Sequence, residues 1–171
     1  MRYSHWVEQE VLTLQWWFLL LLFLISWAVW WRLVDKGRLF EIGFLGLFIA
    51  CAASLMDATG TELGFWTYHY KLFPLYNRLL TADLTLIPIC FMLIYQWFPG
   101  WKPYVCALAV LALGASFVAE WVFAFLDIYE PVIWKSYYSF PIYLLLGVAA
   151  KGMMLCSHKI IFTYRARRTI R

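Results

Sequence analysis

Apolar residues in this chain form long runs that short polar segments separate. A transmembrane helix needs about 20 mostly apolar residues, within a range of about 17–25. Five runs meet that requirement, and they cover residues 12–34, 40–56, 79–98, 104–125 and 140–162. The first run is too long for a signal-peptide core and lacks a small-residue cleavage site, so we expect it to be a span. The pattern predicts an all-α polytopic membrane protein in which five transmembrane helices form one domain, residues 1–171.

The composition agrees with this fold class. Of the 171 residues, 64% are hydrophobic and 14% are charged, and the mean hydropathy is +0.71. Soluble domains are roughly 45–50% apolar and about 25% charged. A soluble fold would leave much apolar surface in water, so the expected environment is a lipid bilayer. The net charge of +4 does not indicate nucleic-acid binding, because most of the excess lies in the C-terminal segment TYRARRTIR.

The Lys and Arg residues predict an orientation, because cytoplasmic loops are enriched in them. Five spans place the two termini on opposite sides of the membrane. One side then holds Arg32, Lys36, Arg38, Lys102, Lys159, Arg165, Arg167, Arg168 and Arg171. The other side holds Arg2, Lys71, Arg78 and Lys135. We therefore expect the N-terminus outside and the C-terminus in the cytoplasm.

Small residues recur every four positions in the second and fourth expected spans, as in Gly46, Ala50 and Ser54. This spacing lets helix backbones approach closely, so we expect these two spans at the centre of the bundle. The leucine-rich first span is expected to face lipid. Pro88 is expected to kink the third span, unless neighbouring helices absorb its effect.

Two long segments on the expected outer side are rich in aromatic residues. They are residues 57–78 and residues 127–139. Aromatic rings prefer the headgroup level of a membrane. We expect the first segment to lie on the bilayer surface or to cap the bundle, and the second to behave similarly.

Four charged residues fall within or at the ends of the expected spans: Asp57, Asp83, Glu120 and Lys151. At 1.5 Å per helical residue, Asp83 lies roughly 6 Å and Glu120 roughly 8 Å from the outer ends of their spans. Asp57 ends the second span, and Lys151 lies roughly 16 Å deep in the fifth. These positions predict a ligand-binding site in the outer half of the bundle, formed by the four side chains.

This cluster of charges has two interpretations, one structural and one functional. A lone charge at the bilayer centre costs about 2.5–3.5 kcal/mol, so a partner or water is expected. In the first interpretation Lys151 pairs with Glu120, with Asp83 or Asp57 as competing partners, and the pair fixes helix packing. In the second, the charges line a polar cavity that opens outward and binds a cation, a proton or a small polar solute. Asp83 also has a local explanation, because a carboxylate near a helix start interacts favourably with the helix dipole.

The sequence contains no familiar catalytic motif. It has no G-x-S-x-G, no H-E-x-x-H and no phosphate-binding glycine loop. The four cysteines form no C-x-x-C pair, and we interpret them as small buried apolar residues. We expect no metal site and no cofactor. Acid catalysis by a carboxylate is the one chemistry that the sequence permits without a cofactor, and no residue is assigned a catalytic role.

A set of short motifs in residues 75–155 carries a family resemblance. The set comprises Asp83 with Pro88, MLIYQ (Met92–Gln96) with Trp101 and Lys102, SF-x-x-E (Ser116, Phe117, Glu120), Ile128 with Tyr129, Trp134 with Lys135, and YSFPIY (Tyr138–Tyr143). In these motifs the chain resembles a family of small, uncharacterised integral membrane proteins of spore-forming Gram-positive bacteria. The resemblance implies a helical fold and a multi-pass location in the bacterial cytoplasmic membrane. It implies no activity, and it makes Asp83, Glu120 and the start of the fifth span the motif positions.

A weaker resemblance involves GFWTYHY (Gly64–Tyr70) and the acid in the helix that follows it. In these features the chain is similar to membrane-embedded carotenoid cyclase domains. Those enzymes place a proline next to paired acids, whereas TADLTLIP in this chain has one acid.

Three hypotheses for the function remain open. The first is an outward-facing polar site that binds a cation or small polar solute for transport or sensing. The second is a structural or assembly subunit of a membrane complex, and the third is an acid-catalysed enzyme that acts on a lipid-soluble substrate. Besides the lipid bilayer, the expected partners are a second copy of the chain or another membrane protein.

Overall fold

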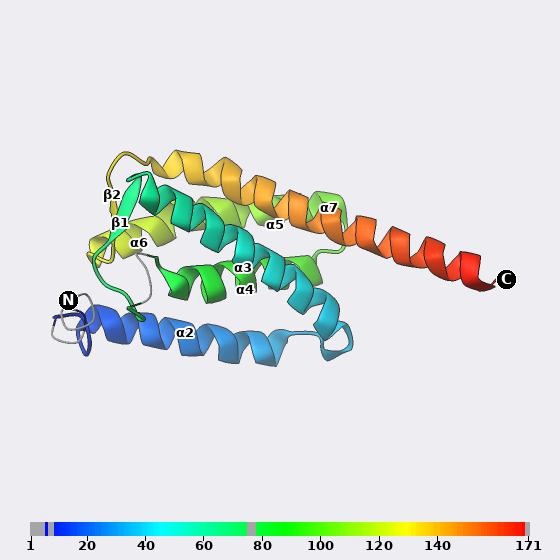
Figure 1. Ribbon diagram of the computed structural model, residues 1–171, viewed down its shortest axis with the longest axis horizontal. Helices are drawn as coiled ribbons and strands as arrows, with labels where there is room; N and C mark the ends of the chain where they lie inside the picture. Colours follow the sequence, from blue (N-terminus) through cyan, green and yellow to red (C-terminus); the bar gives the residue numbers. More distant parts are fainter. Residues whose placement is uncertain (1–5, 7–8, 75–77, 170–171) are drawn as a thin grey trace.

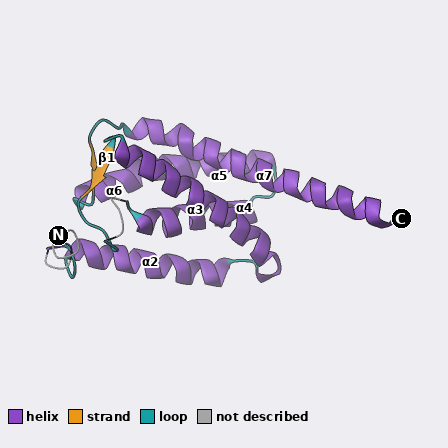
Figure 2. Cartoon of the chain, viewed as in Figure 1, coloured by secondary structure: helices purple, strands orange, loops and turns teal. Residues whose placement is uncertain are grey.

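The computed structural model describes residue 6 and residues 9–74 and 78–169, and this part of the chain is mostly helical (Figure 2). Its α-helices are α2 (Leu14–Leu33), α3 (Leu39–Glu62), α4 (Ile87–Trp97), α5 (Trp101–Leu113), α6 (Glu120–Phe125) and α7 (Ser136–Thr169). Its other elements are a 3₁₀ turn, η1 (Lys36–Arg38), two π-helical turns, η2 (Ala82–Leu86) and η3 (Gly114–Ala119), and two strands, β1 (Trp66–Tyr68) and β2 (Tyr129–Pro131).

Five helices result from these elements, because η2 continues into α4, and α5 continues through η3 into α6. Four of them are long and apolar enough to cross a membrane: Leu14–Leu33, Lys36–Glu62, Trp101–Phe125 and Ser136–Ser157. The fifth, Ala82–Trp97, is apolar but shorter. The fold is therefore that of a multi-pass helical membrane protein. The expectation of five full spans holds for four helices, and residues 79–98 form a shorter helix than predicted.

Helix α3 lies in the middle of the bundle, and α2 lies along one side of it (Figure 1). In the most apolar part of Lys36–Glu62, 33% of the residues are buried, whereas in Leu14–Leu33 the share is 11%. This difference confirms that the second span is central and that the first faces outward, as predicted. A Cβ atom at Gly46 would lie 2.4 Å from Sδ of Met92, so this glycine lets α3 and α4 pack closely.

The fourth span does not share the central place that its small residues predict. Only 17% of its most apolar window is buried, against 28% for Ser136–Ser157 of α7. Gly147 of α7 instead makes the close approach, because a Cβ there would lie 2.6 Å from Leu108 of α5. Three of the four cysteines, Cys51, Cys106 and Cys156, are exposed, so the interpretation of the cysteines as buried residues is wrong for them.

Helix α3 ends in a left-handed glycine that turns the chain toward β1. The φ of Gly64 is +71°, and its N–H donates to the Thr61 carbonyl, while Phe65 N–H donates to the Gly60 carbonyl. This pair of bonds is the Schellman arrangement, which glycine favours because it has no Cβ. The predicted second span, residues 40–56, is therefore too short, because α3 runs on to Glu62.

Helix α6 ends in the same arrangement and turns the chain toward β2. Asp127 has a φ of 58°, its N–H donates to the Ala124 carbonyl, and Ile128 N–H donates to the Phe123 carbonyl. Two helix ends of the same form thus deliver two strands to one end of the bundle.

Strands β1 and β2 form an antiparallel pair across that end (Figure 1). Trp66 pairs with Pro131 and Tyr68 with Tyr129. The Phe65 carbonyl also accepts N–H groups from residues 132, 133 and 134 at 3.0–3.2 Å. We call residues 65–68 and 129–134 the cap. The expectation that the two aromatic segments lie at one end of the bundle is confirmed, and they cap it as a pair.

Candidate functional site

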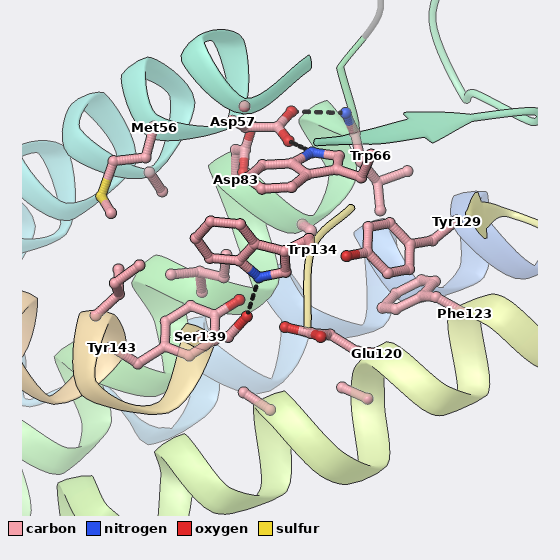
Figure 3. A pocket seen from close by; sticks show the side chains of 18 of the residues that line it. Met56, Asp57, Trp66, Asp83, Glu120, Phe123, Tyr129, Trp134, Ser139 and Tyr143 are labelled. Carbon is pink, nitrogen blue, oxygen red and sulfur yellow. Dashed lines mark hydrogen bonds between the residues drawn. The ribbon is translucent and has the colours of Figure 1, made fainter. Parts of the chain in front are cut away.

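A cavity of about 420 Å³ lies beneath the cap, between α3, η2, α6 and α7 (Figure 3). This volume falls within the roughly 300–1,000 Å³ typical of small-molecule sites. Its walls are mainly apolar and aromatic, and three of the predicted site residues line it: Asp57, Asp83 and Glu120. The structure thus brings together three acids from three separate helices.

Asp57 lies inside α3 and is buried, whereas the sequence placed it at the end of a span. Its Oδ1 accepts Trp66 Nε1–H at 2.8 Å and Tyr68 O–H at 2.6 Å, and its Oδ2 accepts Leu79 N–H at 3.3 Å. Carboxylates in buried sites need such donors to offset their lost hydration. Asp57 therefore ties α3 both to the cap and to the start of the helix that carries Asp83.

Asp83 faces the cavity from η2, with 4% of its surface exposed. Its carboxyl group lies beside that of Asp57 (Figure 3). Its Oδ2 atom receives no hydrogen bond from the described residues. Two carboxylates in contact repel each other, and a proton or a bound cation relieves that repulsion. Oδ2 of Asp83 is thus a buried carboxyl oxygen whose hydrogen-bonding capacity the described residues leave unused.

Glu120 enters the cavity from the opposite wall, at the start of α6 (Figure 3). The hydroxyl groups of Ser139 and Ser136, at the start of α7, lie near its carboxyl group. Ser139 Oγ also accepts Trp134 Nε1–H at 2.8 Å. Trp134 and Ser139 therefore join the cap to α7, beside Glu120 of α6.

Each of the two π turns in the described chain stands at one of these acids. Asp83 lies within η2, where Ile87 N–H donates to the Ala82 carbonyl five residues back. Glu120 follows η3, and its own N–H donates to the Ala115 carbonyl in the same way. Pro88 explains the π turn at η2, because proline has no N–H and residue 88 therefore cannot donate a regular α-helical bond. Such turns are rare and frequently occur at functional sites.

Aromatic side chains of the cap form the end wall of the cavity. The rings of Phe65 and Trp134 stack at 5.6 Å, and those of Trp66 and Trp134 meet edge to face at 5.0 Å. Gly60 makes room for this packing, because a Cβ there would lie 2.1 Å from the Trp66 ring. Tyr129 adds its ring on the side of Glu120 (Figure 3).

Two tyrosines of the cap remain neutral at ordinary pH. Burial raises the pKa of Tyr68 well above its usual value, and the adjacent Asp57 carboxylate raises it further. Burial also raises the pKa of Tyr129, with the Glu120 charge as the next cause. Both phenols are therefore O–H groups, and Tyr68 O–H donates a hydrogen bond to Asp57.

Lys151 does not belong to this site, and its predicted pairing with Glu120 is wrong. Its Nζ donates to the carbonyls of Phe98 and Pro99 at 2.9 and 2.8 Å and lies 4.1 Å from the Tyr104 ring. Those carbonyls belong to the turn between α4 and α5, which is about 30 Å from Glu120 at 1.5 Å per helical residue. Lys151 instead satisfies carbonyls that the end of α4 leaves without helical partners.

No ion pair joins the three acids to a lysine or arginine within the described part of the chain. Arg78 attracts Asp83 through space and does not line the cavity. The described lining residues include no lysine, arginine or histidine. The purely structural interpretation requires an ion-paired cluster. The described residues that line the cavity do not form one. The described residues also contain no group of three His, Cys, Asp or Glu side chains placed to hold a metal ion.

Several cavity residues were not singled out by the sequence. Trp66 and Trp134 were expected only as part of aromatic surface segments, and Ser139 and Tyr143 of α7 were noted only within the YSFPIY motif. Two sequence signals point to the paired helix ends. They are Gly64 and Asp127, each of which follows an apolar run.

An acid-lined aromatic cavity in a multi-pass helical membrane protein is the class of site that these features define. The chain matches no family model, no curated protein and no solved structure in the comparisons.

Proposed function

We propose that the cavity is a binding site for a small cation, used in transport or sensing. One observation carries the proposal: every charged side chain that lines the cavity is a carboxylic acid. A buried charge requires an opposite charge or hydrogen-bond donors, and Asp83 keeps one oxygen without a described donor. A cation between Asp83 and Glu120 would supply what both walls lack.

The walls favour an organic cation over a bare metal ion. Aromatic faces attract cations, with about 0.5–2 kcal/mol per contact depending on desolvation. Trp66, Trp134 and Tyr129 offer such faces next to the acids. The cavity also exceeds the size of a bare ion, since 420 Å³ equals about 14 water molecules at roughly 30 Å³ each.

Thermal unfolding of the protein in lipid nanodiscs tests the proposal. The probes are Na⁺, Mg²⁺, tetramethylammonium and benzyltrimethylammonium at constant pH and ionic strength. A ligand at a hundred times its Kd adds about 2.7 kcal/mol to the free energy of unfolding, so the unfolding temperature should rise with an organic cation. Glu120→Gln and Asp83→Asn should each lose that rise.

Glu62→Gln is the matched control, because Glu62 is an exposed acid at the end of α3 that does not line the cavity. It should keep the full response to the organic cation. A flat response of the wild type to all four cations, or an equal loss in Glu62→Gln, contradicts the proposal.

Acid catalysis on a lipid-soluble substrate is the second candidate, and one observation favours it. Asp83 lies against a second carboxyl group inside a mainly apolar cavity, which suits a proton donor. Incubation in deuterium oxide with a membrane lipid extract tests this function. An acid catalyst that protonates carbon would place deuterium in a lipid product, and Asp83→Asn would not. Unlabelled lipids after incubation with the wild type would remove this candidate.

The bacterial cytoplasmic membrane is the location we propose, with the N-terminus outside. The family resemblance supports the membrane, and the distribution of Lys and Arg supports the orientation. In that orientation the cap and the cavity lie on the outer side.

A further inference from the structure

The exposed part of the cavity lining lies on a single helix. Of its lining residues, three are exposed, and all three belong to α3: Leu55, Met56 and Thr59. Leu55 is 68% exposed and Met56 is 40% exposed. The cavity therefore opens along α3 and is closed elsewhere by buried or half-buried side chains.

This opening lies within an apolar span and not at its end. Leu55 precedes the last residue of α3, Glu62, by seven positions, which is about 10 Å of helix. The facing wall consists of half-buried side chains of α7, among them Ile142 and Leu146. Figure 3 shows Met56 of α3 and Tyr143 of α7 on opposite sides of the cavity. With α3 as a membrane span, Leu55 and Met56 on its exposed face would meet acyl chains.

The cap covers the route along the bundle axis. Phe65, Trp66 and Trp134 pack against one another above the cavity, and Asp57 fixes Trp66 by a hydrogen bond. A ligand from water would have to displace this packed aromatic group. A ligand from the bilayer meets an apolar entrance with charged groups behind it.

We infer that the occupant is an amphiphile with an ammonium head and an apolar tail, which enters sideways from the bilayer between α3 and α7. The head lies between Asp83 and Glu120 against the aromatic faces of the cap. The tail leaves the cavity past Leu55 and Met56. This inference rests on the proposed function, because it names the class of cation that the site takes.

Alkyltrimethylammonium ions test the inference, because they share one head and differ in the tail. Binding of tetramethylammonium and octyltrimethylammonium is measured in nanodiscs of uncharged lipid, and uptake by protein-free nanodiscs is subtracted. The octyl ion should bind the wild type at least tenfold more tightly than the tetramethyl ion. Leu55→Trp should weaken binding of the octyl ion about tenfold, and should weaken binding of the tetramethyl ion less.

Leu47→Trp is the matched control, because Leu47 is on the same helix, is 62% exposed and does not line the cavity. It should bind both ions as the wild type does. Equal affinity for the two ions, or an equal effect of the two Trp variants, overturns the lateral entrance while the cation site stands. Failure of the wild type to bind either ion overturns this inference and the proposed function together.

Discussion

Asp57 is the residue that joins the cap to the bundle, and its loss should be costly. Asp57→Ala would leave three donors without their acceptor: Trp66 Nε1–H, Tyr68 O–H and Leu79 N–H. Unpaired buried groups cost about 1–3 kcal/mol each, with some relief from rearrangement. We expect the free energy of unfolding to fall by roughly 2–4 kcal/mol, as measured by denaturation in detergent micelles.

Tyr68→Phe is the graded control for Asp57, because it removes one donor and leaves the carboxylate with two. It should lower the free energy of unfolding by about 1 kcal/mol. An Asp57→Ala protein as stable as the wild type would mean that the cap is held by ring packing alone.

Lys151 should contribute to stability and have no effect on the cavity. Lys151→Met removes the donor to the Phe98 and Pro99 carbonyls, so we expect a loss of about 1.5–3 kcal/mol in unfolding free energy. The double variant with Lys151→Met and Glu120→Gln should lose the sum of the unfolding free energies that the two single variants lose, because distant sites do not couple. A coupling energy above about 0.5 kcal/mol between the two substitutions would show that they interact after all.

At the residue scale, the sequence predicted that Asp57, Asp83 and Glu120 lie together, and it misplaced Lys151. Asp83 and Glu120 are conspicuous because a carboxyl group in an apolar run needs a reason. The partner of Lys151 is a set of backbone carbonyls in a turn, which no side-chain pattern reveals. Trp66 and Trp134 looked like interface anchors because their inward packing depends on the helix ends at Gly64 and Asp127.

At the element scale, the π turn at η2 positions Asp83, and Pro88 sustains it. Pro88→Ala restores a backbone N–H that can form a regular α-helical bond. The helix should then rewind and turn Asp83 away from the cavity. We expect binding of benzyltrimethylammonium to weaken about tenfold, which is about 1.4 kcal/mol. The shift in unfolding temperature with added ligand measures this effect.

Pro103→Ala is the control for this substitution, because Pro103 is exposed in the first turn of α5 and does not line the cavity. It should bind the ligand as the wild type does. If Pro88→Ala also binds normally, the π turn does not set the position of Asp83.

The helices were predictable from sequence, whereas their details were not. Apolar runs located all five, because length and hydropathy determine whether a segment is buried in lipid. The extra turns of α3 beyond residue 56 were missed because Asp57, Thr59 and Gly60 look polar or helix-breaking in isolation. The burial of Asp57 and Gly60 depends on the cap, which is built from two segments distant in the sequence.

The orientation of the whole molecule is a prediction that decides which compartment the cap faces. A protease site added after Arg171 should be protected in sealed right-side-out vesicles and cleaved after permeabilisation. The physical reason is the excess of Lys and Arg in the loops and tail on that side. Cleavage in intact vesicles would reverse the orientation and place the cap in the cytoplasm.

We propose that the whole molecule is a helical bundle that holds a positive charge between acids beneath an aromatic cap. On this proposal the cavity selects its ligand by charge. Benzyltrimethylammonium and neopentylbenzene have nearly the same shape and differ by one positive charge. The most direct measurement compares their binding to the wild type and to Glu120→Gln in nanodiscs, with membrane uptake subtracted. We expect the wild type to favour the cation at least tenfold and Glu120→Gln to lose that preference. Equal binding of the two compounds by the wild type would contradict the account, because the cavity would then select shape and not charge.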